Sequence, residues 1–139
     1  MFPGITHFHI GGDEHGATYN ELYNLEFVEY ANKQSTYLKS LGLTPRMWND
    51  GVMTSTMASL DKNIEISYWA WDGDKTDERD RLISIRAGMD EIINAGFKVY
   101  NCNSYYTYSV PRDPDNISGN ANYAAVDAYN NWNLSKSIS

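Results

Sequence analysis

The chain has 139 residues, of which 42% are hydrophobic and 14% aromatic, and this composition suits one globular domain with a buried core. Its formal net charge of -7 argues against binding to nucleic acid or to anionic membranes, because both attract basic surfaces. A single cysteine, Cys102, excludes an internal disulfide and a zinc site made of cysteines, and no apolar run approaches the about 20 residues of a membrane span.

The chain consists of four successive units, each with an apolar strand, a polar turn and a helical stretch. The first strand is expected at residues 6–11. The helix after it is expected at about 20–41, where leucine, valine and alanine recur at helical spacing and Gly42 is suited to end the helix. The second strand is expected at 45–49, followed by a shorter helical stretch near 51–60.

The third and fourth units follow the same order. A strand is expected at residues 63–70 and a helix at about 77–95, and the last strand is expected at 97–103. A loop rich in proline, aspartate and asparagine then leads to an alanine-rich helix at about 121–131. The inner face of the helix at 77–95 is expected to carry Leu82, Ile85, Met89 and Ile92.

Strands that alternate with helices predict a parallel sheet with right-handed crossovers. The units average about 35 residues, close to one eighth of a barrel of about 250 residues. We therefore predict an α/β fold that is a partial (β/α)8 (TIM) barrel, with about four consecutive βα units in a single partial domain spanning residues 1–139. An open, doubly wound sheet is the alternative, but no glycine-rich phosphate loop follows any strand.

Polar and aromatic residues gather where the predicted strands end, which is where barrel enzymes hold their active sites. Four tryptophans and eleven tyrosines, with many asparagines and aspartates, suit a carbohydrate site, although aromatic side chains also pack in cores. The residues expected on this rim are His9, Asp13, Glu14, Trp48, Asn49, Asp50, Trp69, Asp72, Asp74, Tyr105, Tyr106 and Tyr108.

Asp13 and Glu14 directly follow the Gly11-Gly12 turn at the end of the first strand. Two carboxyl groups on one turn can converge on one ligand, and a carboxyl group that keeps its proton near neutral pH can protonate the leaving oxygen of a glycoside. The alternative interpretation is a pair of acidic residues that only opens a solvated loop or caps the next helix.

A second interpretation of this turn is a metal site, because His7, His9 and His15 lie close to the acidic pair in the sequence. A His-X-His pattern on a strand occurs in barrel metallohydrolases. However, these are the three histidines of the chain, and the other strand ends offer no histidine ligand. We therefore predict no metal at the site.

Four segments resemble one known family in the correct order. The segment FHIGGDE at residues 8–14 resembles the catalytic motif of glycoside hydrolase family 20, the β-N-acetylhexosaminidases. The fifth strand of that family is similar to YLKSLGLTPRMWNDG at 37–51, and the sixth to NIEISYWAWDGD at 63–74. The seventh is similar to GFKVYNCNSYYTY at 96–108, and the likeness is strongest to the dispersin-like branch of the family.

The resemblance implies substrate-assisted hydrolysis with net retention, in which the 2-acetamido oxygen of the sugar attacks the anomeric carbon. Glu14 would be the general acid and then the base, and Asp13 would orient the acetamido group and stabilise its positive charge. The substrate-binding residues implied are His9, which would position the acidic pair from nearby, Trp48 and Trp69 as aromatic walls, Asp74 on a sugar hydroxyl and Tyr108 on the acetamido oxygen. The implied partner is a glycan that contains N-acetylglucosamine, and no cofactor is implied.

The resemblance covers about strands 4 to 7 of the family's catalytic barrel, and strands 1 to 3 and 8 have no counterpart in residues 1–139. We therefore expect these residues alone to be a weak or inactive catalyst, with a homodimer hiding the open barrel edges. A carbohydrate-binding or inert remnant is the alternative. The parent protein is expected outside the cell or on its surface, although residues 1–10 show no signal-peptide pattern.

Overall fold

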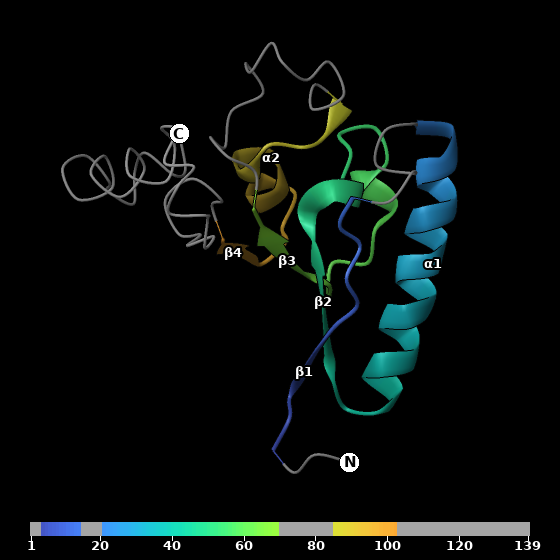
Figure 1. Ribbon diagram of the computed structural model, residues 1–139, viewed down its shortest axis with the longest axis vertical. Helices are drawn as coiled ribbons and strands as arrows, with labels where there is room; N and C mark the ends of the chain where they lie inside the picture. Colours follow the sequence, from blue (N-terminus) through green and yellow to red (C-terminus); the bar gives the residue numbers. More distant parts are fainter. Residues whose placement is uncertain (1–3, 15–20, 70–84, 103–139) are drawn as a thin grey trace, which may run out of the picture.

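The computed structural model describes residues 4–14, 21–69 and 85–102 (Figure 1). The helix predicted at 121–131 lies outside these residues. Within the described part of the chain, no helix combines the length and the apolar character needed to cross a membrane. In chain order the elements are β1 (His7–His9), α1 (Glu21–Ser40), β2 (Thr44–Trp48), the 3-10 helices η2 (Asn49–Gly51) and η3 (Met57–Ser59), β3 (Glu65–Tyr68), α2 (Met89–Asn94) and β4 (Val99–Asn101).

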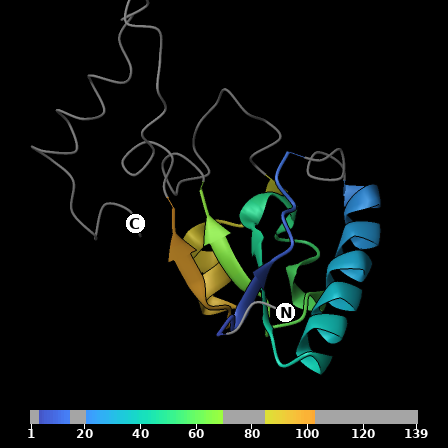
Figure 2. The same cartoon turned by 60° about the horizontal axis from the view of Figure 1, so that its bottom comes forward.

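The strands form one parallel sheet in the order β1-β2-β3-β4, so each strand pairs with the next one along the chain (Figure 2). Pairing of β1 with β2 extends past the strand, because the Ile10 N–H donates to the Arg46 carbonyl at 2.8 Å and the Trp48 N–H to the Gly11 carbonyl at 3.0 Å. Consecutive parallel strands joined through helices confirm the predicted partial barrel.

Helix α1 ends where the sequence predicts. Gly42 has a φ of 75°, which is the left-handed conformation that glycine adopts without strain. Its N–H donates to the Lys39 carbonyl and the Leu43 N–H donates to the Leu38 carbonyl, both at 3.0 Å. These two hydrogen bonds are the Schellman motif, which satisfies the last carbonyls of the helix and turns the chain into β2.

The buried face of α1 is partly polar. Leu25 and Leu41, which fit the helical spacing, are 57% and 44% exposed, so they lie off the core. The helix buries Asn24, Val28, Ala31, Ser35 and Leu38 instead. The Asn24 side chain donates to the Gly51 carbonyl at 3.0 Å, which ties the helix to the turn after β2.

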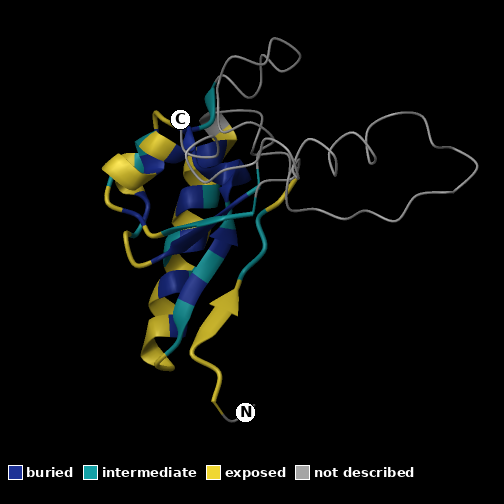
Figure 3. Cartoon of the chain, turned by 90° about the vertical axis from the view of Figure 1, so that its left-hand side faces the viewer, coloured by how far each residue is buried: buried dark blue, intermediate teal, exposed yellow. Residues whose placement is uncertain are grey.

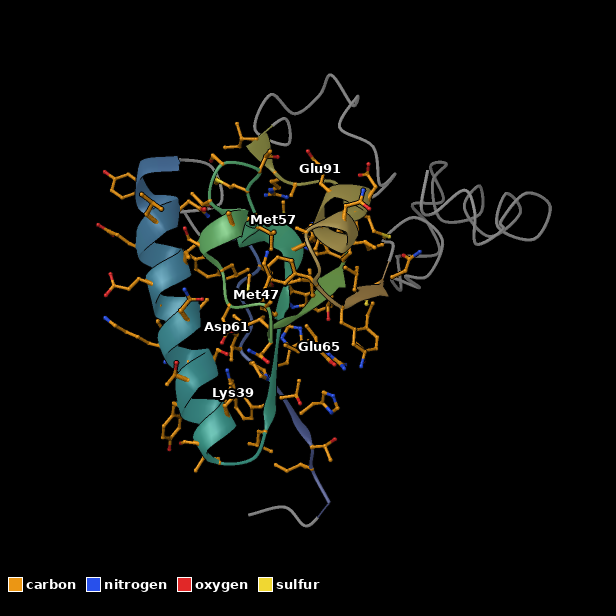
Figure 4. All side chains as sticks on the ribbon, turned by 180° about the vertical axis from the view of Figure 1, so that it is seen from behind. Lys39, Met47, Met57, Asp61, Glu65 and Glu91 are labelled. Atoms are coloured by element: carbon orange, nitrogen blue, oxygen red, sulfur yellow. The ribbon has the colours of Figure 1, made fainter. Side chains whose placement is uncertain are left out.

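At its other end, α1 is held by a carboxylate. Asp61 lies beside the last turns of the helix (Figure 4), where it accepts hydrogen bonds from Ser35 Oγ at 2.7 Å and Lys39 Nζ at 3.4 Å. Burial alone would raise the pKa of Asp61, but hydrogen bonds from Asn63 and Ser35, together with the charge of Lys39, lower it to about 2. The ionised carboxylate is therefore part of the contact between α1 and the segment before β3.

Two helical predictions are wrong within the described residues. The stretch predicted near 51–60 contains only the end of η2 and the short 3-10 helix η3. Of the helix predicted at 77–95, residues 85–88 are not α-helical and α2 begins at Met89, while residues 77–84 lie outside the described part. The physical reason is a long-range pairing: Thr54 N–H donates to Ile85 C=O at 3.1 Å and Ala87 N–H donates to Val52 C=O at 2.8 Å. This antiparallel bridge between Met53 and Arg86 takes the place of helical hydrogen bonds in both segments.

The core lies between the sheet and both helices (Figure 3). Met47 of β2 is fully buried there, between α1 and α2 (Figure 4). The core cluster contains residues from the sheet, from both helices and from the segments that connect them. It consists of Val28, Ala31, Met47, Val52, Leu60, Ile64, Ile66, Tyr68, Ala87, Met89, Ile92 and Phe97. The buried Met89 and Ile92 are two of the four positions predicted to face inward.

Side chains along a strand alternate between the two faces of a sheet. The residues that face away from the core here are largely charged. Glu65 of β3 lies at the centre of this face and accepts from Arg46 Nη2 at 2.6 Å and Lys98 Nζ at 2.8 Å, with His7 Nε2 at 3.4 Å. The Arg46 guanidinium also lies 3.9 Å from the centre of the Tyr100 ring. This cluster of His7, Arg46, Glu65, Lys98 and Tyr100, here called the Glu65 cluster, links all four strands.

Candidate active site

The turn after β1 has an unusual backbone that only certain residues tolerate. Gly11 and Gly12 have φ values of 76° and 93°, and Glu14 has a φ of 49°. The left-handed region costs a residue with a Cβ about 1–2 kcal/mol, so the glycines suit it and Glu14 is held there by its surroundings. The result is a tight turn that leaves Asp13 and Glu14 exposed just after β1.

Phe27 of α1 holds this turn beside the end of β2. A Cβ added at Gly12 would lie 3.1 Å from the Phe27 ring, and one added at Gly51 would lie 2.1 Å from it. The ring therefore fills the space that side chains at these two glycines would need. The close packing brings the turns after β1 and β2 together on one side of α1.

Four of the predicted site residues share one hollow of about 240 Å³, which Asp13, Glu14, Trp48 and Trp69 line. They come from the ends of three successive strands. Asp13 and Glu14 are exposed, whereas the two tryptophans are partly buried and offer apolar walls. An open hollow that combines carboxylates with aromatic faces is suited to a sugar, whose rings stack on aromatic side chains while its hydroxyls take hydrogen bonds.

His9 is exposed and packs against Trp48, which lines the hollow. The two ring centres are 4.9 Å apart and their planes are inclined by 53°. The Gly11 N–H donates to His9 Nδ1 at 3.1 Å, so Nδ1 is an acceptor and the proton of the neutral ring is on Nε2. Partial desolvation by its neighbours lowers the pKa of His9, and the positive charge of Arg46 lowers it further against the opposing effect of Asp13. The neutral form is therefore favoured beside Trp48.

Trp69 is fixed by the two residues that follow β2. Its backbone N–H donates to Asn49 Oδ1 at 2.9 Å, and its indole Nε1–H donates to Asp50 Oδ2 at 2.5 Å. Both partners are buried. Trp69 is consequently held both at its backbone and at the nitrogen of its indole ring.

Asp50 has two more contacts. Its Oδ1 accepts from the Glu14 N–H at 3.4 Å and lies 3.4 Å from Arg86 Nη2. Asp50 was expected on the rim without a role, and Arg86 was not expected at the site. No local pattern signals Arg86, since it reaches Asp50 through the pairing of residues 85–87 with 52–54.

The remaining predictions divide into two groups. Asp74 and Tyr108, with the rim residues Asp72, Tyr105 and Tyr106, lie outside the described residues. Of the histidines weighed as metal ligands, His7 contacts Glu65 at 3.4 Å and His9 contacts the Gly11 N–H, while His15 is not described. Over residues 4–14, 21–69 and 85–102, no three His, Cys, Asp or Glu side chains come close enough to hold a metal ion.

Comparison of the chain with known proteins finds similarity to glycosidases. No family model matches it. The lacto-N-biosidase of Bifidobacterium bifidum is 31% identical over 96 residues, which are 68% of this chain and 8% of the relative.

Solved structures are similar over more of the chain. Dispersin B is 44% identical with a TM-score of 0.75, and the match covers 93% of this chain and 38% of dispersin B. The GH20 catalytic modules of the pneumococcal exo-β-D-N-acetylglucosaminidase StrH are 26% identical with a TM-score of 0.62, over 88% of this chain and 30% of that chain. The chain thus spans well under half the length of each of these relatives.

Proposed function

We propose that this chain, a relative of the family 20 glycoside hydrolases that corresponds to part of their catalytic barrel, carries the acid–base side of a β-N-acetylhexosaminidase active site. The observation that supports the proposal is the shared hollow of Asp13, Glu14, Trp48 and Trp69. The resemblance to GH20 exo-β-D-N-acetylglucosaminidase modules and to dispersin B gives the hollow its substrate class, a glycan that contains N-acetylglucosamine.

In the proposed mechanism, Glu14 protonates the leaving glycosidic oxygen and later removes a proton from the attacking water. The acetamido oxygen of the substrate attacks the anomeric carbon, which gives an oxazolinium intermediate and net retention. Asp13, adjacent on the same turn, accepts the acetamido N–H and stabilises the positive charge that develops on that group. Trp48 and Trp69 line the same hollow and enclose the acetamido group and the sugar ring.

His9 has a positioning role in this proposal. It packs against Trp48 and accepts the Gly11 N–H, so it stabilises both the aromatic wall and the turn that carries the acidic pair. Asp74, on a sugar hydroxyl, and Tyr108, on the acetamido oxygen, are proposed as further ligands by resemblance. Because polymeric glycans lie outside cells, the whole protein is proposed to act outside the cell or on its surface.

Residues 1–139 alone are proposed to be weak catalysts. They supply four adjacent strands, whereas a closed barrel surrounds its substrate with loops from eight. Positioning from the remaining sides contributes a large part of enzymatic rate, since effective molarities of well-oriented groups reach about 10⁵–10⁸ M. Binding of the sugar to the aromatic hollow is expected to persist when turnover is slow.

The proposal is tested with a chromogenic β-N-acetylglucosaminide and the 139-residue chain. We expect slow hydrolysis that Glu14→Gln reduces by about 100-fold or more, because the amide cannot donate or accept the transferred proton. Glu26→Gln, an exposed change on α1, is the matched control and should leave the rate unchanged. Equal rates in the wild type and in Glu14→Gln would contradict the assignment of Glu14, and a rate abolished by chelator would favour a metal hydrolase.

A further inference from the structure

Asp50 is fully buried beneath the hollow and contacts three separate segments of the chain. Its Oδ2 accepts the indole N–H of Trp69, and its Oδ1 accepts the backbone N–H of Glu14 at 3.4 Å. Arg86 Nη2 lies 3.4 Å from the same Oδ1. One carboxylate therefore joins the turn after β1, the end of β3 and the segment that leads into α2.

The contacts of Asp50 require a carboxylate. All three neighbours present N–H donors, and an ionised carboxylate has two oxygens that only accept. An asparagine in its place would offer one accepting oxygen and would turn an NH2 group toward one of these donors. A buried charge also needs a partner of opposite sign, and the side chain of Arg86 is 11% exposed, so the pair is largely shielded from water.

The backbone keeps Arg86 in place. Residues 85–87 run antiparallel to 52–54, with hydrogen bonds of 3.1 Å and 2.8 Å on either side of the Met53–Arg86 bridge. Asp50 lies only a few residues before this bridge, in η2. The positions of the carboxylate and of the guanidinium are therefore set by the short pairing of residues 52–54 with 85–87.

We propose that Asp50, paired with Arg86, is a positioning residue that sets the general acid and the aromatic wall of the hollow relative to each other. It holds the plane of the Trp69 indole through Oδ2, and through Oδ1 it stabilises the left-handed backbone of Glu14. The roles of Glu14 as general acid and of Trp69 as aromatic wall rest on the proposed function. The contacts of the Asp50 carboxylate with both residues do not depend on it.

The direct test is the indole N–H signal of Trp69 in the NMR spectrum of the ¹⁵N-labelled chain, assigned with Trp69→Phe. In Asp50→Asn we expect the signal to move upfield and the indole proton to exchange with solvent about tenfold faster, as for a lost hydrogen bond of about 1.4 kcal/mol. The matched control is Asp61→Asn, which removes a different carboxylate that accepts hydrogen bonds, a partly buried one beside the last turns of α1. It should leave the Trp69 signal in place.

Arg86→Lys is the second variant, because it keeps a positive charge and loses the planar guanidinium. We expect an intermediate change in the Trp69 signal, and this variant decides the question if Asp50→Asn does not fold. An unchanged Trp69 signal in a folded Asp50→Asn protein would overturn the proposal, as would an Asp61→Asn change of equal size.

A binding measurement separates this proposal from the proposed function. N-acetylglucosamine is titrated into the wild type, Asp50→Asn and Asp61→Asn, with tryptophan fluorescence as the readout. We expect about tenfold weaker binding in Asp50→Asn and wild-type affinity in Asp61→Asn, with unchanged circular dichroism in both. If the wild type does not bind the sugar at all, the proposed function fails, whereas the NMR result still decides the role of Asp50. If Asp50→Asn binds as tightly as the wild type, the positioning role is refuted.

Discussion

Phe27 and Gly51 show how a single residue choice supports the site. The Phe27 ring occupies the position that a side chain at residue 51 would take, with only 2.1 Å between its Cε1 and an added Cβ. The same ring lies close to Gly12, so it packs on both turns that carry site residues. A change at either glycine therefore acts on the hollow through Phe27.

Gly51→Ala is expected to destabilise the fold by about 1–3 kcal/mol, the usual cost of forcing extra volume into a packed core. Chemical denaturation of the variant and the wild type measures the difference. The double variant Phe27→Leu/Gly51→Ala provides the control, because a smaller side chain at residue 27 should make the added methyl group less costly. Equal losses from Gly51→Ala in the two backgrounds would show that Phe27 is not the obstacle.

Among the elements, the Glu65 cluster holds the four strands together on the face away from the helices. Burial alone would raise the pKa of Glu65, but hydrogen bonds from Lys98 and Arg46, and the positive charges of both, lower it to about 2. A pKa below the ordinary value of 4.5 means that the ionised group favours folding. This contribution is complete above pH 4.5 and is lost as the pH falls toward 2.

Glu65→Gln should remove the part of the pH dependence of folding stability that comes from the Glu65 carboxyl group. We expect the wild type to lose about 1–2 kcal/mol more than the variant between pH 5 and pH 2.5, a range that allows for solvent on the open face of the sheet. Thermal unfolding at several pH values measures this loss. Asp61 also has a pKa of about 2 and remains in both proteins, so it contributes equally to each. Parallel pH profiles would contradict the account of the cluster.

The sequence predicted the elements whose ends carry their own local signals. Gly42 ends α1 through a Schellman motif, and apolar runs mark the four strands. The helical predictions near 51–60 and over 85–88 were wrong because residues 52–54 pair with 85–87. That contact joins segments about thirty residues apart, and helical spacing within either segment does not reveal it.

The same distinction applies to the site. Asp13, Glu14, Trp48 and Trp69 follow strand ends, so a parallel fold alone brings them together, and the structure places all four around one hollow. The link between Asp50 and Arg86 depends on tertiary pairing and could not be predicted. The burial of Asn24 on α1 could likewise not be predicted from the sequence, because it depends on a hydrogen bond to the distant Gly51 carbonyl.

For the whole molecule, the described sheet ends at β1 and β4, each of which pairs on one side only. Edges of this kind favour pairing with another chain. We propose that the 139-residue chain forms a symmetric homodimer that covers them. Size-exclusion chromatography with light scattering should give twice the monomer mass, and a well-folded monomer at every concentration tested would contradict the dimer.

The measurement that tests the central claim most directly compares two sugars that differ at one position. N-acetylglucosamine and glucose are titrated separately into the 139-residue chain, with tryptophan fluorescence as the readout and Asp13→Asn as the variant. We expect saturable binding of N-acetylglucosamine, little or no binding of glucose, and weaker N-acetylglucosamine binding in Asp13→Asn, because Asp13 is proposed to hold the acetamido group that glucose lacks. Equal binding of both sugars, or no effect of Asp13→Asn, would contradict an acetamido-recognition site in the hollow of Asp13, Glu14, Trp48 and Trp69.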